Sequence, residues 1–210
     1  MPEDLQEKNW DDPELVTRYG KVLDQLSREI FKRPEYFVIA NEADVYFDKH
    51  PEEIDAFMGF AAAAKREIRS RFPQAVIGIS VTYEGLHKGG QRADFIKRVI
   101  AASDAAFFTY YPVLDLKPTR PAQTPAQLDD IINAAQGKAV ILQEIGYPSG
   151  LAGSSPQVQA DFFAIIIPAI IKRPQIKLAS IFALHDFDPK MCKILTGYYG
   201  FGGLLSLTPR

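Results

Sequence analysis

Two glutamates in this sequence lie where a pair of carboxyl groups could carry out chemistry. Glu42 comes directly after Asn41, at the end of the apolar run 36–40, and Glu144 comes directly after Gln143, at the end of the run 139–142. A single polar residue at the end of a buried strand often has no chemical role and only contacts solvent. A pair of carboxyl groups held at one edge of a sheet can instead divide acid–base and nucleophilic roles between them. The elements that position the pair decide between these interpretations.

Apolar strand patterns alternate with helical patterns along the chain. Helices are predicted after Asp12 and after Pro51, around residues 95–100, and from starts at Thr124 and Ser155. We expect the last of these helices to kink or end near its internal proline at position 168. The predicted strands are residues 36–40, 75–83, 105–111, 139–147 and 177–187. Because these strands are almost continuously apolar, they indicate a parallel sheet covered by helices.

The carboxyl ends of these strands carry a set of polar and aromatic side chains. In a (β/α) barrel such ends lie on one face, where active sites are found. Besides the two glutamates, the residues expected there include Asn41, Tyr83, Tyr110, Tyr111 and His185. Tyr110 and Tyr111 are consecutive in a strand and point to opposite faces, so only one of them can point toward the glutamates. We expect that residue to be Tyr111, at the end of its strand.

Composition narrows the classes of function. The chain has 210 residues, 47% hydrophobic and 24% charged, with a net charge of −2, which favours one globular domain and gives no basic surface for nucleic acid. The longest apolar stretch, residues 162–171, is too short to cross a membrane, and the single Cys192 excludes a disulfide within the chain. The sequence contains neither a phosphate-binding loop nor a G-x-S-x-G nucleophile motif, and no cofactor is predicted.

Three motifs resemble those of the clan A glycoside hydrolases, which are retaining (β/α)8 enzymes. "IANEAD" resembles their strand-4 motif, in which an asparagine precedes the acid/base glutamate. "VILQEIGYPSG" resembles their strand-7 nucleophile motif, most of all in the form seen in plant-type β-1,3-glucanases, and is related to that of endo-β-1,4-galactanases. "FFTYYPV" is similar to their strand-6 segment, where a tyrosine commonly hydrogen-bonds the nucleophile. The resemblance extends from about residue 13 to residue 188.

The resemblance implies hydrolysis of a β-linked oligo- or polysaccharide, with Glu42 as general acid/base and Glu144 as nucleophile. Asn41 would bind the 2-hydroxyl of the sugar, and no metal would be required. A retaining glycosidase needs one protonated and one ionised carboxyl group, about 5–5.5 Å apart. The other residues expected to contact substrate are Tyr83, Tyr110, Tyr111 and His185.

The resemblance also implies that the barrel is incomplete. If residues 36–41 form strand 4 and residues 177–186 form strand 8, strands 1 to 3 have no counterpart. We therefore expect an α/β fold of the (β/α)8 TIM-barrel type with strands 4 to 8 present, as a single domain over residues 1–210. The strand-2 arginine and the strand-8 tryptophan of the family also lack counterparts, and the latter region offers His185 and Phe187.

An open sheet leaves two edge strands unpaired, which predicts self-association through those edges. The chain would then be a fragment, a truncated reading frame, or a chain completed by a partner. A five-stranded open sheet that needs no completion is the alternative. Residues 1–15 are acidic and polar and are not expected to form a signal peptide. The compartment therefore stays open, with a secreted or periplasmic full-length form as one option.

Two other functions are compatible with the same residues. The first is a degenerate barrel that binds carbohydrate through its glutamates without cleaving it. The second is a metal-dependent barrel isomerase or lyase that would use Glu42, Glu144, His185 and Asp186 as ligands. The metal hypothesis leaves Asn41 and the tyrosines unexplained.

Overall fold

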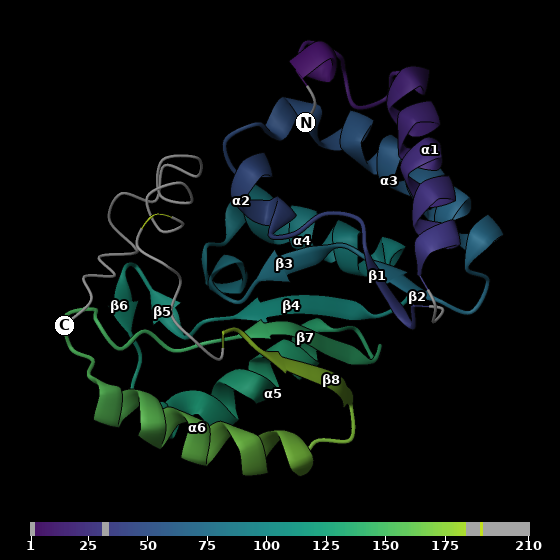
Figure 1. The fold of residues 1–210 in the computed structure, drawn as a ribbon. Coiled ribbons are helices and arrows are strands. Elements are labelled where there is room, and N and C mark those ends of the chain that lie inside the picture. Colours follow the sequence, from purple (N-terminus) through teal and green to yellow (C-terminus); the bar gives the residue numbers. More distant parts are fainter. Residues whose placement is uncertain (1–2, 31–33, 184–189, 191–210) are drawn as a thin grey trace.

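The computed structural model describes residues 3–30, 34–183 and 190, in which strands and helices alternate (Figure 1). The parallel strands are β1 (Tyr36–Val38), β2 (Val76–Gly78), β3 (Ser80–Thr82), β4 (Ala106–Tyr110), β7 (Val140–Ile145) and β8 (Ile176–Ile181). The long helices are α1 (Pro13–Glu29), α3 (Ile54–Arg71), α4 (Gly90–Ala102), α5 (Thr124–Ala134) and α6 (Pro156–Ile171). The short elements are α2 (Ala43–Phe47), the 3-10 turns Glu3–Leu5, Pro51–Glu53, Glu84–His87 and Pro121–Gln123, and the hairpin of β5 (Val113–Leu114) and β6 (Lys117–Pro118).

The parallel strands are paired in the order of the chain. β1 pairs with β2, while β3, β4, β7 and β8 pair successively. The predicted strand 75–83 is interrupted at Ile79, so that its first half pairs with β1 and its second half with β4. Hydrogen bonds continue across the interruption, because the backbone N–H of Ser80 donates to the carbonyl of Ala40 at 2.9 Å. β2 and β3 therefore occupy one strand position.

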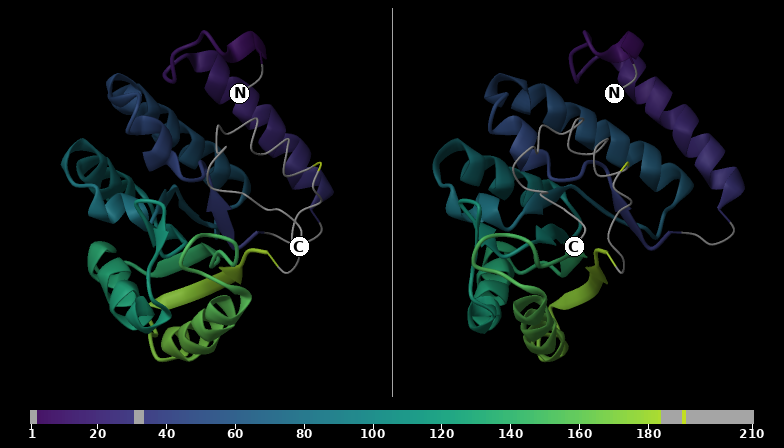
Figure 2. Two further views of the ribbon diagram at one scale, coloured as in Figure 1. Left: turned by 90° about the vertical axis from the view of Figure 1, so that its left-hand side faces the viewer. Right: turned by 60° about the vertical axis from the view of Figure 1, so that its left-hand side comes forward.

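The helices cover one side of these strands. α3, α4, α5 and α6 lie in an arc outside the strands, and α1 packs against α3 (Figure 2). This arrangement is that of part of a (β/α)8 barrel, as the sequence predicts. In the described residues, β1 and β8 are each paired on one side only. Self-association through these two edges stays a prediction, which light scattering on the purified chain would test.

The predicted helix starts are confirmed at two caps. The Asp12 side chain accepts from the backbone N–H of Glu14 at 2.8 Å, and Ser155 accepts from that of Val158 at 3.2 Å. The last helix was expected to kink or end near Pro168, and α6 includes this proline and ends at Ile171. Proline removes one N–H donor, but its carbonyl still accepts from a residue of the following turn. Among the described residues, no helix is long and apolar enough to cross a membrane.

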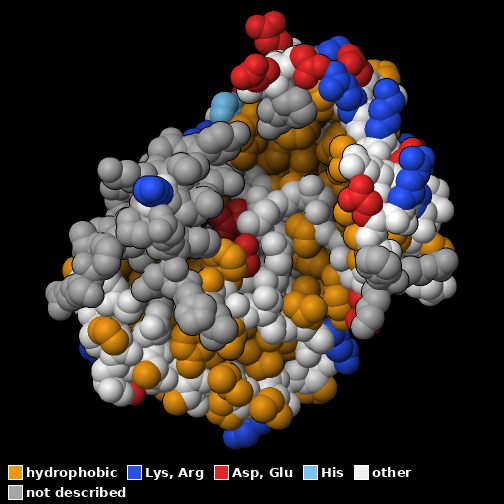
Figure 3. All heavy atoms as spheres, viewed as in Figure 1, with side chains coloured by type: hydrophobic (Ala, Val, Ile, Leu, Met, Phe, Trp, Pro, Cys, Tyr) orange, Lys and Arg blue, Asp and Glu red, His pale blue; other side chains and the backbone are white. Residues whose placement is uncertain are grey.

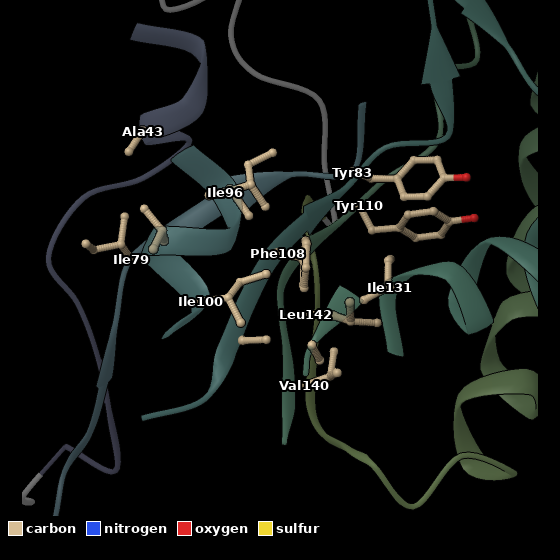
Figure 4. Close-up of a cluster of buried hydrophobic side chains, with 14 of the residues drawn as sticks. Ala43, Ile79, Tyr83, Ile96, Ile100, Phe108, Tyr110, Ile131, Val140 and Leu142 are labelled. Carbon is tan, nitrogen blue, oxygen red and sulfur yellow. The ribbon is translucent and has the colours of Figure 1, made fainter. Parts of the chain in front are cut away.

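The strands separate two sets of side chains by alternation. One set faces the helices and forms the main core, where Phe108, Tyr110 and Leu142 pack against Ile100 and Ile131 (Figure 4). The other set faces the inside of the partial barrel, where the buried Phe107 and Ile141 pack with the partly buried Tyr36, Val38 and Leu178. Gly78 belongs to this inner layer, because a β-carbon there would overlap the Phe107 ring. This inner layer packs along the strands, on the side of the sheet that faces the inside of the partial barrel.

Candidate active site

Glu42 lies in a tight turn between β1 and α2. Its backbone is left-handed, with φ 48° and ψ 41°, and it is the residue that precedes the first turn of α2. This conformation is uncommon for a residue with a β-carbon. The side chain is half-buried, and its Oε1 accepts a 2.7 Å hydrogen bond from the hydroxyl of Thr109 on β4. The predicted strand end is therefore a strained turn that places the carboxyl group over the sheet.

Glu144 lies on β7 next to a β-bulge. Phe108 is opposite Leu142, but the next residue of β4, Thr109, is opposite Glu144, so Gln143 is the extra residue of the bulge. Gln143 and Glu144 are consequently both half-buried, instead of lying one inside and one outside the sheet. The bulge aims two consecutive polar side chains into the same space.

The Glu144 carboxylate is held by two donors. The Tyr111 hydroxyl donates to Oε2 at 2.9 Å, and the Asn41 amide donates through Nδ2 to Oε1 at 3.3 Å. The Asn41 amide is itself oriented by Gln143, whose Nε2 donates to Asn41 Oδ1 at 3.1 Å. Asn41 is exposed, so this chain of hydrogen bonds reaches the surface of the site.

The surroundings of the two carboxyl groups differ. Burial raises the pKa of Glu42, and the negative charges of Glu144 and Asp44 raise it further, while Thr109 and Arg92 act in the opposite direction. Burial together with the Glu144 carboxylate raises the pKa of Tyr111 far above its ordinary value. Tyr111 therefore stays protonated and remains a donor to Glu144. In the space-filling view, acidic side chains lie in a hollow at the middle of the face, between hydrophobic side chains (Figure 3).

The structure corrects the placement of Tyr83 and Tyr110. Both rings are buried, with exposed fractions of 2% and 0%, and they meet edge to face at 5.2 Å between ring centroids (Figure 4). The Tyr110 hydroxyl donates to Gln127 Oε1 on α5 at 2.6 Å, and burial raises the pKa of Tyr83 to about 12. Alternation along β4 explains the correction for Tyr110, which points toward the helices, whereas Thr109 and Tyr111 point toward the glutamates. Tyr83 lies in the turn after β3 and packs against Tyr110. On this geometry the two buried tyrosines do not line an open substrate site.

His185 and Asp186, the remaining predicted residues, lie outside the described residues. Within the part of the chain that the structure describes, Glu42 and Glu144 do not belong to a group of three side chains able to share a metal ion. The one such group found there is His50, Glu52 and Glu53. Its Glu53 carboxylate already accepts from Trp10 and Tyr46, at 2.7 and 3.0 Å.

Two residues of the site were missed from the sequence. Thr109 could have been found, because it is two positions before Tyr111 and therefore on the same face of β4. Gln143 could not be found in this way, because strict alternation puts it on the face opposite Glu144. The bulge that reverses this placement depends on the pairing with β4, which no local pattern in the sequence reveals.

The fold and the site together define a class of structure. The carboxyl ends of parallel strands in a partial (β/α)8 barrel carry two glutamates, one with a raised pKa and one held by an amide and a phenol. No protein-family model matches the chain, and no curated protein sequence matches it either. Among the solved structures similar to it are clan A glycoside hydrolases, at low sequence identity.

Three of these structures illustrate the likeness. An active-site mutant of the β-1,3-glucanosyltransferase of Rhizomucor miehei, in complex with laminaritriose, has a TM-score of 0.60 and 15% identity, over 82% of this chain and 62% of that one. GH5_18 of Streptomyces cattleya, in complex with Manβ1-4GlcNAc, has a TM-score of 0.68 and 16% identity, over 90% of this chain and 50% of that one. Xylanase 10B of Thermotoga maritima has a TM-score of 0.59 and 14% identity, over 95% and 62%.

The chain thus spans about two thirds or less of the length of these three structures. At such identities the likeness establishes the fold alone, that of a partial (β/α)8 barrel. Activity depends on the side chains of the site.

Proposed function

We propose that this chain carries the catalytic site of a retaining glycoside hydrolase, with Glu144 as nucleophile and Glu42 as general acid/base. The observation that carries the proposal is the asymmetry of the two carboxyl groups. Glu42 is half-buried with a raised pKa, which suits a group that must be protonated at rest. Glu144 is aimed by Asn41 and Tyr111, which suits a group that must attack as a carboxylate.

The first step of the proposed reaction is displacement of the leaving group. A Glu144 oxygen bonds to the anomeric carbon as the glycosidic bond breaks, and the Glu42 proton passes to the leaving oxygen. The product is an ester between the sugar and Glu144. In the second step, Glu42 takes a proton from water, the water oxygen attacks the anomeric carbon, and Glu144 is released with retention of configuration.

Asn41 and Tyr111 support this sequence through their contacts with Glu144. Tyr111 donates to one carboxylate oxygen and leaves the other oxygen oriented by Asn41. Asn41 is also exposed, and its amide could turn its second N–H to the sugar 2-hydroxyl, where hydrogen bonds strengthen as the transition state forms. We propose a β-linked oligo- or polysaccharide as substrate. The β-1,3-linked and Manβ1-4GlcNAc-type ligands named with the similar structures suggest which compounds to test first.

The test uses aryl β-glycosides with good and poor leaving groups and the variants Glu144→Gln and Glu42→Gln. Glu144→Gln should abolish hydrolysis of all of them. Glu42→Gln should lower turnover of poor leaving groups by on the order of 10²–10⁴-fold while sparing glycosylation by good ones. Equal losses on both kinds of substrate would show that the two roles are assigned wrongly.

A second readout does not require turnover. A 2-deoxy-2-fluoro glycoside with a good leaving group should leave a covalent adduct on Glu144, which mass spectrometry of the digested protein would locate. Saturable sugar binding without any adduct or product would support the carbohydrate-binding barrel and refute the hydrolase. Proton NMR of the first product formed should show the substrate's own anomeric configuration, since inversion would exclude double displacement.

A further inference from the structure

A buried ion pair lies two residues along the chain from Glu42. Asp44 on α2 is 0% exposed and Arg92 on α4 is 7% exposed. The Arg92 Nε donates to Asp44 Oδ2 at 2.9 Å, and its Nη2 lies 2.8 Å from the same oxygen. The proposed mechanism uses neither side chain, and buried charges of this kind are retained only where their partners are well placed.

The pair belongs to a larger group of contacts. The backbone N–H of Thr82 donates to Asp44 Oδ1 at 2.8 Å, and the Thr82 hydroxyl donates to Oδ2 at 2.7 Å. The Thr82 hydroxyl oxygen accepts in turn from Arg92 Nη2 at 3.0 Å and from the backbone N–H of Gly85 at 2.9 Å. A β-carbon at Gly85 would overlap Asp44 Oδ2. We call Asp44, Thr82, Gly85 and Arg92 the Asp44 clamp.

The turn at Glu42 needs support from outside itself. Its left-handed backbone is unfavourable for a residue with a β-carbon, and its side chain makes no capping hydrogen bond to α2. α2 has only five residues, too few to hold a helical start alone. The clamp supplies the missing support, because it ties the first turn of α2 to β3 and α4.

We propose that the Asp44 clamp positions Glu42, by fixing the first turn of α2 so that the Glu42 carboxyl group stays against Thr109 and faces Glu144. The inference rests on the proposed role of Glu42 as acid/base. It makes Asp44, Thr82 and Arg92 positioning residues, which act through Glu42 and do not touch substrate.

The clamp also sets part of the charge around Glu42. The groups that face it are Glu144 from β7, Asp44 from α2, Arg92 from α4 and the Tyr111 hydroxyl after β4. Asp44→Asn removes one negative charge that raises the pKa of Glu42 and leaves Arg92 without its buried counter-charge. Both changes favour ionised Glu42, so its pKa should fall.

The first experiment measures the Glu42 pKa directly. Carbon-13 NMR of glutamate-labelled full chain would follow the side-chain carboxyl signal, assigned by its absence in Glu42→Gln. We expect a lower pKa in Asp44→Asn and an unchanged one in Asp129→Asn. The second variant is a control for removal of an Asp–Arg pair elsewhere in the fold, because Asp129 on α5 pairs with Arg173, which follows α6, through two hydrogen bonds of 2.8 and 2.9 Å. An unchanged Glu42 pKa in Asp44→Asn would overturn the proposal.

The second experiment separates positioning from stability. Thr82→Val removes the hydroxyl of the clamp at nearly constant volume, and Thr82→Ser keeps it. For Thr82→Val we expect a loss on the order of 10²-fold with poor leaving groups and a much smaller loss with activated aryl glycosides, with recovery in Thr82→Ser. Equal losses on both kinds of substrate, or equal behaviour of the two variants, would refute positioning.

These readouts distinguish the two proposals. If wild-type chain hydrolyses no glycoside and forms no adduct, the hydrolase fails, while the Glu42 titration still decides whether the clamp controls this carboxyl group. If Asp44→Asn does not fold, Glu42 is titrated in the milder pair Thr82→Val and Thr82→Ser, neither of which removes a charge. Loss of the clamp hydroxyl should release the Glu42 carboxyl group from its buried position and lower its pKa in the valine variant alone, and equal pKa values in the two variants would refute positioning.

Discussion

The two faces of β4 carry similar side chains that have different hydrogen-bond partners. Toward the helices, Phe108 packs in the core and the Tyr110 hydroxyl donates to the amide oxygen of Gln127. Toward the inside of the partial barrel, the Thr109 hydroxyl donates to Glu42 and the Tyr111 hydroxyl donates to Glu144. Tyr110 and Tyr111 are consecutive, yet one completes a buried hydrogen bond and the other orients a carboxylate.

Tyr110 and Tyr111 differ in the group that accepts their hydrogen bond and not in their own hydroxyls. Burial raises the pKa of both hydroxyls far above the ordinary value, so each remains a donor near neutral pH. Tyr110 donates to a neutral amide, where the hydrogen bond mainly prevents a buried unsatisfied group. Tyr111 donates to a carboxyl group, where the hydrogen bond controls geometry and charge. Substitutions on the two faces should therefore change different properties.

The largest expected effect is on the outer face. Phe108→Ala should lower the free energy of unfolding by about 3–5 kcal/mol, because a fully buried ring is replaced by a cavity. Urea denaturation followed by circular dichroism would measure it. A loss below about 1 kcal/mol would mean that this face is not the close-packed core, and the contrast between the faces would disappear.

Tyr111→Phe should have the largest effect among the inner-face hydroxyls. The loss of a hydrogen bond to a charged group corresponds to about 1.5–3 kcal/mol, which we expect to appear in the activation free energy of glycosylation. Stopped-flow release of an activated aryl group would measure this step. Unfolding should change little, because the Glu144 carboxylate is only half-buried and can be solvated. A stability loss with unchanged kinetics would reverse the assignment of the two faces.

Tyr110→Phe is the matched change on the outer face. It leaves the buried Gln127 Oε1 with the longer 3.4 Å hydrogen bond from the Thr119 hydroxyl, at a cost of about 1–2 kcal/mol in the free energy of unfolding. The rate of glycosylation and the Glu42 pKa should both be unchanged. Any shift of the Glu42 pKa in this variant would show that the two faces are coupled through the strand.

The smallest expected effect is a dependence of stability on pH. The raised pKa of Glu42 means that the folded state holds its proton above the ordinary value of 4.5, at which the unfolded chain releases it. Relative to Glu42→Gln, the wild type should therefore lose stability as pH rises from below 4.5 through the raised pKa, and remain constant below that window. Urea midpoints of both proteins at a series of pH values would show the trend. The opposite slope would mean that the folded protein stabilises the ionised carboxylate.

Much of the architecture could be read from local patterns. The alternation of apolar strands with capped helices predicts the parallel sheet, because the spacing of apolar residues within each segment indicates whether it is a helix or a strand and which side is buried. The NE and QE pairs predict which strand ends carry the carboxyl groups, and the period of two separates Tyr111 from Tyr110. The strand boundaries were less accurate, since residues 75–83 read as one strand but change neighbours at Ile79.

Only the tertiary structure decided how the site is held. The bulge at Gln143 depends on the pairing of β7 with β4, and the residues that contact α2 beside the left-handed turn at Glu42, Thr82 and Arg92, come later in the chain. Asp44 and Arg92 are 48 positions apart in sequence, and neither residue type predicts which residue it will pair with. A local pattern records whether a side chain is buried or exposed. Which side chains meet depends on strand register and helix packing, and these are properties of the whole fold.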